Sequence, residues 1–179
     1  MVRHRIRKEE FEALLKEVPE GVRLELLDGE VYEMAPIGSG HAGLVSYLAK
    51  ALERLYGDRA IVSVQNPILL NPFSLPQPDI ALLKPREDFY VQAFPEPKDI
   101  LLVVEVAYTT KDVDGKKLAL YAQAGIPESW LVDGETSLLE VYREPRGGLY
   151  RLKRLVEPGE EVAPEGLGAP SLVWRPPRP

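Results

Sequence analysis

Two short apolar runs, each with a carboxylate at one end, constrain this chain more than any other feature of its sequence. Asp79 directly precedes the run 80–83, and the run 100–104 leads into Glu105. Runs of β-branched residues and leucines bounded by proline and charged residues are typical of buried strands. A carboxylate at the end of a buried strand is costly unless it is paired or bound to a cation. On neighbouring strands, Asp79 and Glu105 therefore predict a metal site.

A lysine is missing where many metal nucleases have one, two residues after the glutamate. That position lies on the same face of the strand as Glu105, and here it is Ala107. The following segment, 110–124, predicts a helix that Gly125 ends. If the first turn of this helix lies near the end of the strand, Lys117 could reach the two carboxylates in place of the missing lysine.

The remaining segments predict an α/β fold: a mixed, twisted β-sheet flanked by helices, with a β-hairpin near each end of the chain. Apolar residues at helical spacing predict helices over 7–17 and 41–56. Alternating or continuous apolar runs predict strands at 22–26, 30–34, 60–64, 129–133, 137–143, 149–156 and 171–174.

Length and composition predict one compact domain over residues 1–179, because the chain has 179 residues, of which 45% are hydrophobic. No apolar run approaches the roughly 18 residues of a membrane helix. The basic N-terminus is not followed by an apolar segment, so no signal peptide is predicted. The absence of cysteine excludes disulfides, thiol catalysis and cysteine-bound zinc. We therefore expect a cytoplasmic protein.

The charge balance opposes broad attraction to nucleic acid. The chain has 22 Lys+Arg and 28 Asp+Glu, a formal net charge of −6, whereas phosphate binding relies on clustered Lys and Arg. A local basic strip is still compatible with this balance. The second predicted hairpin offers either a DNA-facing strip or an ordinary solvated face, with five basic residues: Arg143, Arg146, Arg151, Lys153 and Arg154.

Aromatic residues also occur in the polar segment 84–98. Phe89, Tyr90 and Phe94 could stack on nucleic-acid bases. Packing of this segment onto the domain is the alternative that we favour.

Several motifs together resemble the Uma2 family, restriction-endonuclease-like proteins with a variant PD-(D/E)XK core. The resemblance extends over nearly the whole chain, and its most diagnostic part is residues 117–133. The matching positions are Arg23-Leu-Glu25-Leu-Leu-Asp-Gly29-Glu30, His41, Val64-Gln65-Asn66-Pro67, Pro78-Asp79, Val103-Val104-Glu105-Val106 and Lys117-Leu-Ala-Leu-Tyr121-Ala-Gln-Ala-Gly125-Ile-Pro-Glu-Ser-Trp130-Leu-Val-Asp133.

The resemblance implies a metal-dependent endonuclease that hydrolyses phosphodiester bonds in DNA. Asp79 and Glu105 would hold one or two Mg²⁺ ions, with Mn²⁺ as a possible substitute, because hard cations prefer carboxylate and water oxygens. The backbone carbonyl of Val106 would complete the metal site, as it does in similar nucleases. Lys117 would orient the attacking water or stabilise the charge that develops on the phosphate.

Three further residues gain a candidate role in catalysis from the resemblance. Glu25 would be a third acid, although strand alternation alone favours a solvent-facing residue. His41 stands at the start of a predicted helix, where histidine is more often a surface or capping residue. Gln65 would orient a ligand or the attacking water, or it is only a turn residue.

One departure from the family pattern leaves the active lysine open. Family members usually carry an aspartate four residues before the helix lysine, and here that position is Val113. The nearest acid, Asp114, is three residues before Lys117. Lys116 and Lys117 therefore both remain candidates.

Two other function classes remain open. One is a module with a nuclease-like fold that binds nucleic acid or protein without cleaving. The other is a structural oligomer in which the acids form salt bridges. In each case we expect a homodimer, because the second hairpin and the region of Trp174 offer apolar surface on a small domain.

Overall fold

The computed structural model describes residues 1–108 and 111–178, without the side chains of residues 111 and 112. Thr110, where the predicted helix begins, lies outside the described residues. The elements in chain order are α1 (Lys8–Leu15), β1 (Leu24–Leu27), β2 (Glu30–Glu33), α2 (Ser39–Tyr56), β3 (Ile61–Val64), β4 (Ile80–Leu83), a 3-10 turn (Pro97–Asp99), β5 (Ile100–Ala107), α3 (Lys111–Gln123), β6 (Glu128–Asp133), β7 (Leu139–Arg146), β8 (Leu149–Val156), β9 (Glu161–Val162) and β10 (Leu172–Val173).

The central feature is a six-stranded mixed sheet in the order β3-β4-β5-β6-β7-β8. β5 and β6 run parallel, and all other neighbours are antiparallel. The parallel pair requires a crossover connection, which α3 provides. Asp79 immediately precedes β4 and Glu105 lies in β5, its hydrogen-bonded neighbour. The predicted mixed sheet flanked by helices is therefore confirmed.

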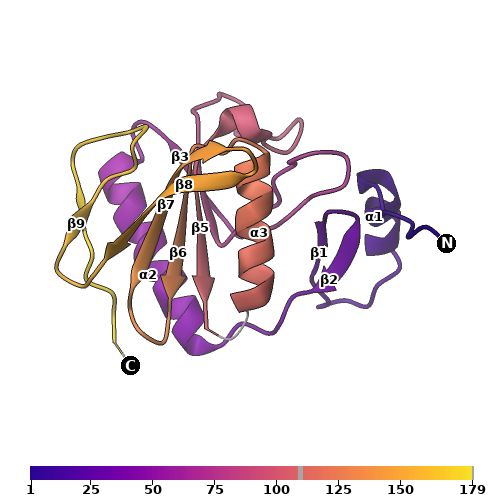
Figure 1. Cartoon of the computed structure of the whole chain (residues 1–179), viewed down its shortest axis with the longest axis horizontal. Helices are drawn as coiled ribbons and strands as arrows, with labels where there is room; N and C mark the ends of the chain where they lie inside the picture. Colours follow the sequence, from indigo (N-terminus) through magenta and orange to yellow (C-terminus); the bar gives the residue numbers. More distant parts are fainter. Residues whose placement is uncertain (109–110, 179) are drawn as a thin grey trace.

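The two long helices cover opposite faces of this sheet (Figure 1). Side chains alternate between the faces of a strand, so alternate residues of the central strands pack against different helices. Leu82, Val104 and Val132 belong to the core under α2, together with Leu48 of that helix. Ala81 and Val103 belong to the core under α3. Glu105 has the same parity as Val103 and so faces α3.

The N-terminal hairpin, β1 and β2, lies beside α3 and outside the main sheet (Figure 1). All four residues of β1 are buried. Leu24 and Leu26 pack against Phe11 of α1, while Glu25 points to the opposite side and contacts α3 through Lys117. The expectation of a solvent-facing Glu25 from strand alternation was therefore wrong, because the polar face of this strand is covered by a helix that the local sequence does not reveal.

The predicted second hairpin is confirmed: β7 and β8 pair antiparallel and form the last two strands of the main sheet. The expectation for Trp174 was wrong. Trp174 offers no apolar surface: it is buried and donates a hydrogen bond from Nε1 to the Ser137 carbonyl oxygen (2.8 Å). Exposed apolar residues of this region are instead on β8, namely Leu149, Leu152 and Leu155. In the described residues, no helix has the length and apolar character needed to span a membrane.

The packing of α2 predicts a large loss of stability from one truncation. Leu48 is fully buried between α2 and the sheet, so Leu48→Ala should lower the free energy of unfolding by about 2–5 kcal/mol. The matched control is Leu15→Ala, also in a helix but at a position 38% exposed, which should change it by less than about 0.5 kcal/mol. Urea denaturation measures both, and equal losses would contradict the assigned core.

Candidate active site

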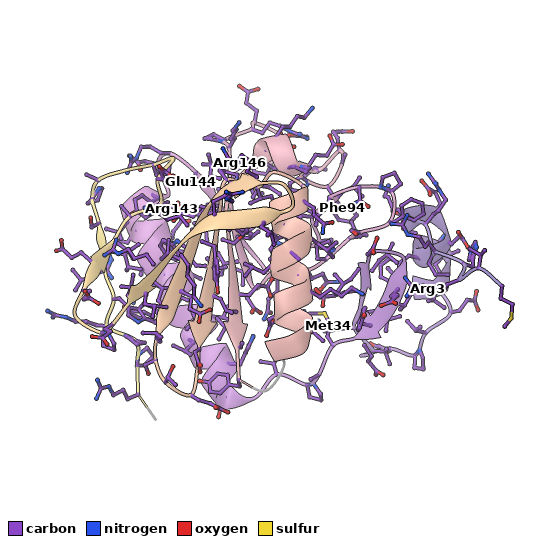
Figure 2. All side chains as sticks on the ribbon, viewed as in Figure 1. Arg3, Met34, Phe94, Arg143, Glu144 and Arg146 are labelled. Carbon is purple, nitrogen blue, oxygen red and sulfur yellow. The ribbon has the colours of Figure 1, made fainter. Side chains whose placement is uncertain are left out.

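A pocket of about 470 Å³ opens between the end of β5, the first half of α3 and the N-terminal hairpin. The connection from β2 to α2, residues 34–38, forms one of its walls. Figure 2 shows Met34 of this wall beside the lower end of α3, where the helix begins. Of the candidate site residues of the sequence, Lys116 does not line the pocket, and seven others do: Glu25, His41, Gln65, Asp79, Glu105, Val106 and Lys117.

Asp79 is fixed by groups from two other elements. Its Oδ2 accepts a hydrogen bond from the backbone N–H of Val106 (2.8 Å), which ties the start of β4 to β5. Its Oδ1 lies 3.1 Å from Nε2 of His41, in the first turn of α2. The hydrogen bond to Asp79 raises the pKa of His41, although partial burial opposes the shift. His41, which belongs to α2, therefore orients the Asp79 carboxylate.

Glu105 is held from α3 by two residues one helical turn apart. Tyr121 donates its hydroxyl proton to Oε1 (2.9 Å), and Lys117 Nζ lies 3.0 Å from Oε2. Burial raises the pKa of the Glu105 carboxyl well above its ordinary value. The charge of Lys117 opposes this shift, whereas the charges of Asp79 and Glu25 add to it. Glu105 is thus a buried carboxylate with more negative than positive charge around it.

Lys117 joins the helix, the central sheet and the N-terminal hairpin. Its side chain is only 4% exposed, and its ammonium donates to Glu25 Oε1 (2.7 Å) and to the Gln77 carbonyl oxygen (3.3 Å) besides its contact with Glu105. Burial disfavours the charged form, but the carboxylates of Glu105 and Glu25 outweigh it, so the pKa of Lys117 lies above its ordinary value.

Lys116 points elsewhere. Its Nζ donates to Glu30 Oε2 (2.6 Å) and to the Tyr32 hydroxyl (2.9 Å) of the N-terminal hairpin. The hydrogen bond from Lys116 is the main reason that the pKa of Glu30 falls to about 2. In this arrangement Lys117 faces the carboxylates of the pocket, and Lys116 faces the partly exposed side of the hairpin.

The pocket holds a surplus of buried negative charge. Three buried carboxylates, those of Glu25, Asp79 and Glu105, line it, against one buried cation among the described lining residues, Lys117. Such a surplus is costly in a protein interior unless a further cation offsets it. The donors are hard oxygen atoms, the type that Mg²⁺ prefers.

The arrangement fits a cation that completes its shell with water. In the described part of the chain, no three His, Cys, Asp or Glu side chains converge closely enough to hold a metal by themselves. Mg²⁺ is usually held by only one or two carboxylates and keeps several waters. A carboxylate also has about four acceptor sites, so Asp79 and Glu105 keep acceptor capacity beyond the contacts described above.

Two residues that contact the site carboxylates were not identified as site residues from the sequence: Gln77, which lines the pocket, and Tyr121, which is not among its lining residues. Gln77 precedes Asp79 by two residues, and its backbone N–H donates to Glu25 Oε1 (2.9 Å). Tyr121 shares a helix face with Lys117 in the sequence pattern, and this spacing was the signal for its contact with Glu105. Gln77 left no comparable signal, because its partners Arg23, Leu24 and Glu25 lie 52 to 54 residues earlier in the chain. Gln65 lies in the left-handed region (φ 54°), and its N–H donates to the Asp79 carbonyl oxygen (3.0 Å).

The candidate basic strip is divided and lies away from the pocket. Arg143 contacts Glu128 (3.2 Å) and donates to the Ala163 carbonyl oxygen, and Lys153 contacts Glu140 (3.4 Å). Figure 2 shows Arg143 and Arg146 at the end of the sheet opposite Met34. These residues therefore form no continuous basic surface beside the carboxylates.

Comparisons with known proteins agree with this fold. The sequence matches the family model of Uma2, described as "Putative restriction endonuclease", over residues 8–173. No curated protein matches the chain. The structure is similar to the crystal structure of a "putative nuclease belonging to DUF820" from Anabaena variabilis ATCC 29413, with a TM-score of 0.73 and 18% sequence identity over 90% of each chain. At this identity the second likeness concerns the fold alone.

The charge surplus predicts opposite effects for the two partners of one ion pair. Lys117→Met leaves Glu25 and Glu105 buried without their cation and should lower the free energy of unfolding by about 3–5 kcal/mol. Glu105→Gln removes one surplus charge, while Lys117 keeps Glu25, and should leave the stability equal to or above that of the wild type. The matched control is Lys116→Met, which removes a partly exposed pair and should cost about 1 kcal/mol or less. Urea denaturation compares the three variants, and a strongly destabilised Glu105→Gln would contradict the charge surplus.

Proposed function

The chain belongs to the Uma2 family, and from this premise we propose that it is a metal-dependent endonuclease that hydrolyses phosphodiester bonds in DNA. The observation that carries the proposal is the convergence of Asp79, Glu105 and Lys117 in one pocket, at the end of two hydrogen-bonded strands. A buried carboxylate pair with a single lysine provides what such a reaction needs: ligands for a hard cation and a fixed positive charge beside it.

Asp79, Glu105 and the backbone carbonyl of Val106 would hold Mg²⁺, or Mn²⁺ in its place. A bound ion of this kind lowers the pKa of its water and offsets the charge of the cleaved phosphate. His41 keeps one oxygen of Asp79 in place, and Tyr121 does the same for Glu105. These contacts fix both carboxylates before substrate arrives.

Lys117 would act on the reacting phosphate itself. Its three N–H donors are directed at Glu25, the Gln77 carbonyl oxygen and Glu105 Oε2, so a water or phosphate oxygen beside Glu105 would take the place of one of these acceptors. Its raised pKa keeps it protonated, and it therefore donates rather than accepts a proton. Glu25 holds the ammonium from the other side, and Gln65 lies at the rim, where it would orient the water.

The proposal predicts that metal binding and cleavage are lost together in Glu105→Gln and in Asp79→Asn. Calorimetric titration with Mg²⁺ or Mn²⁺ measures the first, and nicking of supercoiled plasmid measures the second. Because Glu105→Gln is expected to be as stable as the wild type, its loss of activity cannot be ascribed to unfolding. Unchanged metal binding in Asp79→Asn would refute the ligand assignment.

Lys117→Met should retain metal affinity and lower the cleavage rate by about 10²–10³, the typical effect of losing one transition-state contact. The assay uses conditions in which circular dichroism shows the variant to be folded. Lys116→Met is the control, and loss of cleavage in that variant alone would assign the role to Lys116. Metal binding without wild-type cleavage of plasmid, linear duplex, single-stranded DNA or RNA would favour the non-catalytic binding module.

We also propose that the protein is a homodimer located in the cytoplasm. The exposed apolar residues of β8 suggest the dimer, and a DNA substrate suggests the location. Leu149, Leu152 and Leu155 are 42–64% exposed on the edge strand of the sheet. Light scattering at micromolar concentration should give twice the chain mass, and Leu152→Lys should reduce it to that of the monomer. A monomer mass for the wild type would overturn this proposal.

A further inference from the structure

The shape of the pocket constrains the nucleic acid that can reach the carboxylates. Its volume of about 470 Å³ lies within the range of small-ligand sites, about 300–1,000 Å³. The side chains of Asp79, Glu105 and Lys117 are only 10%, 7% and 4% exposed. A double helix is stiff over this scale, with a persistence length of about 50 nm. A strand that leaves its partner can enter a pocket of this size more readily than an intact duplex.

Apolar and aromatic side chains surround the buried carboxylates. Tyr32 and Met34 come from the N-terminal hairpin and the connection that follows it, Val113 from the first half of α3, and Tyr108 from the end of β5. These four side chains offer no positive charge to a phosphate. They suit the faces of nucleobases, which stack on aromatic side chains in proteins that bind single strands.

Tyr108 is placed in this wall by two glycines from other elements. A Cβ at Gly40, in the first turn of α2, would lie 2.8 Å from the Tyr108 hydroxyl. A Cβ at Gly134, in the turn after β6, would overlap the Tyr108 ring. The backbone N–H of Gly134 also donates to the Ala107 carbonyl oxygen (2.8 Å). Any larger residue at Gly40 or Gly134 would displace the ring, so three elements fix it at the pocket, three residues after Glu105.

The charge distribution also favours a single strand over an intact duplex. Binding to a duplex depends chiefly on neutralising many phosphates with Lys and Arg. This chain has a net charge of −6, and its best basic cluster is divided and lies at the other end of the sheet (Figure 2). Single strands are also bound partly through basic grooves, but stacking adds an uncharged contribution of about 1–3 kcal/mol per base, because every base has an aromatic face.

From the pocket and its aromatic wall we infer that the substrate enters as an unpaired nucleotide, in a single strand or at a frayed end, and that Tyr108 stacks on its base. The inference rests on the proposed function, since it concerns the substrate of the same site. It assigns to Tyr108 the contact with the base and leaves the contact with the phosphate to Lys117.

Fluorescence anisotropy tests the inference by binding alone. The probes are a short labelled oligothymidylate and the same strand annealed to its complement, with Ca²⁺ in place of Mg²⁺ so that cleavage does not interfere. The single strand should bind more tightly than the duplex. Tyr108→Leu keeps an apolar side chain without the ring and should weaken single-strand binding by about 5- to 150-fold, the range for loss of one stacking aromatic.

Two variants serve as matched controls. Tyr108→Phe keeps the ring and should bind the single strand like the wild type. Phe89→Ala removes an aromatic residue that is 70% exposed outside this pocket and should also have no effect. Tighter or equal binding of the duplex, no effect of Tyr108→Leu, or a loss confined to Phe89→Ala would overturn the inference.

A parallel cleavage assay separates this inference from the proposed function. Duplex cleavage at an undiminished rate in Tyr108→Leu would leave the endonuclease intact and refute the unpaired substrate. Single-strand binding that depends on Tyr108, without cleavage of any strand, would refute the endonuclease and leave the binding mode standing. Absence of binding to either probe would overturn both.

Discussion

The arrangement of this protein depends on one buried ammonium group. Lys117 belongs to α3. Its ammonium lies between Glu25 of the N-terminal hairpin and Glu105 of the central strand, at 2.7 and 3.0 Å. A buried charge is tolerated only with close partners, so these contacts fix the positions of the hairpin, the helix and the sheet relative to one another. The hairpin is also held by a backbone hydrogen bond from Leu75 to Leu26 and by the pair of Lys116 with Glu30.

The same group leaves the pocket short of positive charge. Among the described residues, three buried carboxylates share the pocket with one buried lysine, and the pKa of Glu105 is raised by burial and by its acidic neighbours. In a purely structural ion pair, opposite charges would balance. The imbalance lowers the stability of the free protein and favours whatever cation binds there, because a ligand that binds only the folded state stabilises it. Sites that are poorly optimised for stability in this way are often functional.

The substitution of Ala107 for a strand lysine has a structural consequence. A lysine on the strand would approach the carboxylates from the sheet, on the backbone that carries Glu105. A lysine on α3 approaches from above the sheet, together with Tyr121 one turn later, and leaves the strand position free for a small residue. The distance between the charged groups is then set by packing of the helix on the sheet. The tight packing of Leu120 and Tyr121 against Val103 thus bears directly on the chemistry of the site.

The sequence by itself indicated most of the elements and their approximate bounds, because burial patterns and turn residues act over short distances along the chain. It also predicted that Asp79 and Glu105 lie on neighbouring strands. It also indicated a helix lysine from the absence at position 107. Only the tertiary structure decided that Lys117 rather than Lys116 faces the carboxylates, that Glu25 is buried, and that Gln77 and Tyr108 line the pocket. Each of these depends on a distant neighbour: Lys117 and Gln77 contact Glu25, 92 and 52 residues away in the chain, and Tyr108 lies against Gly40 and Gly134. Local periodicity carries no information about such neighbours, since it records which face of an element is covered but never by what.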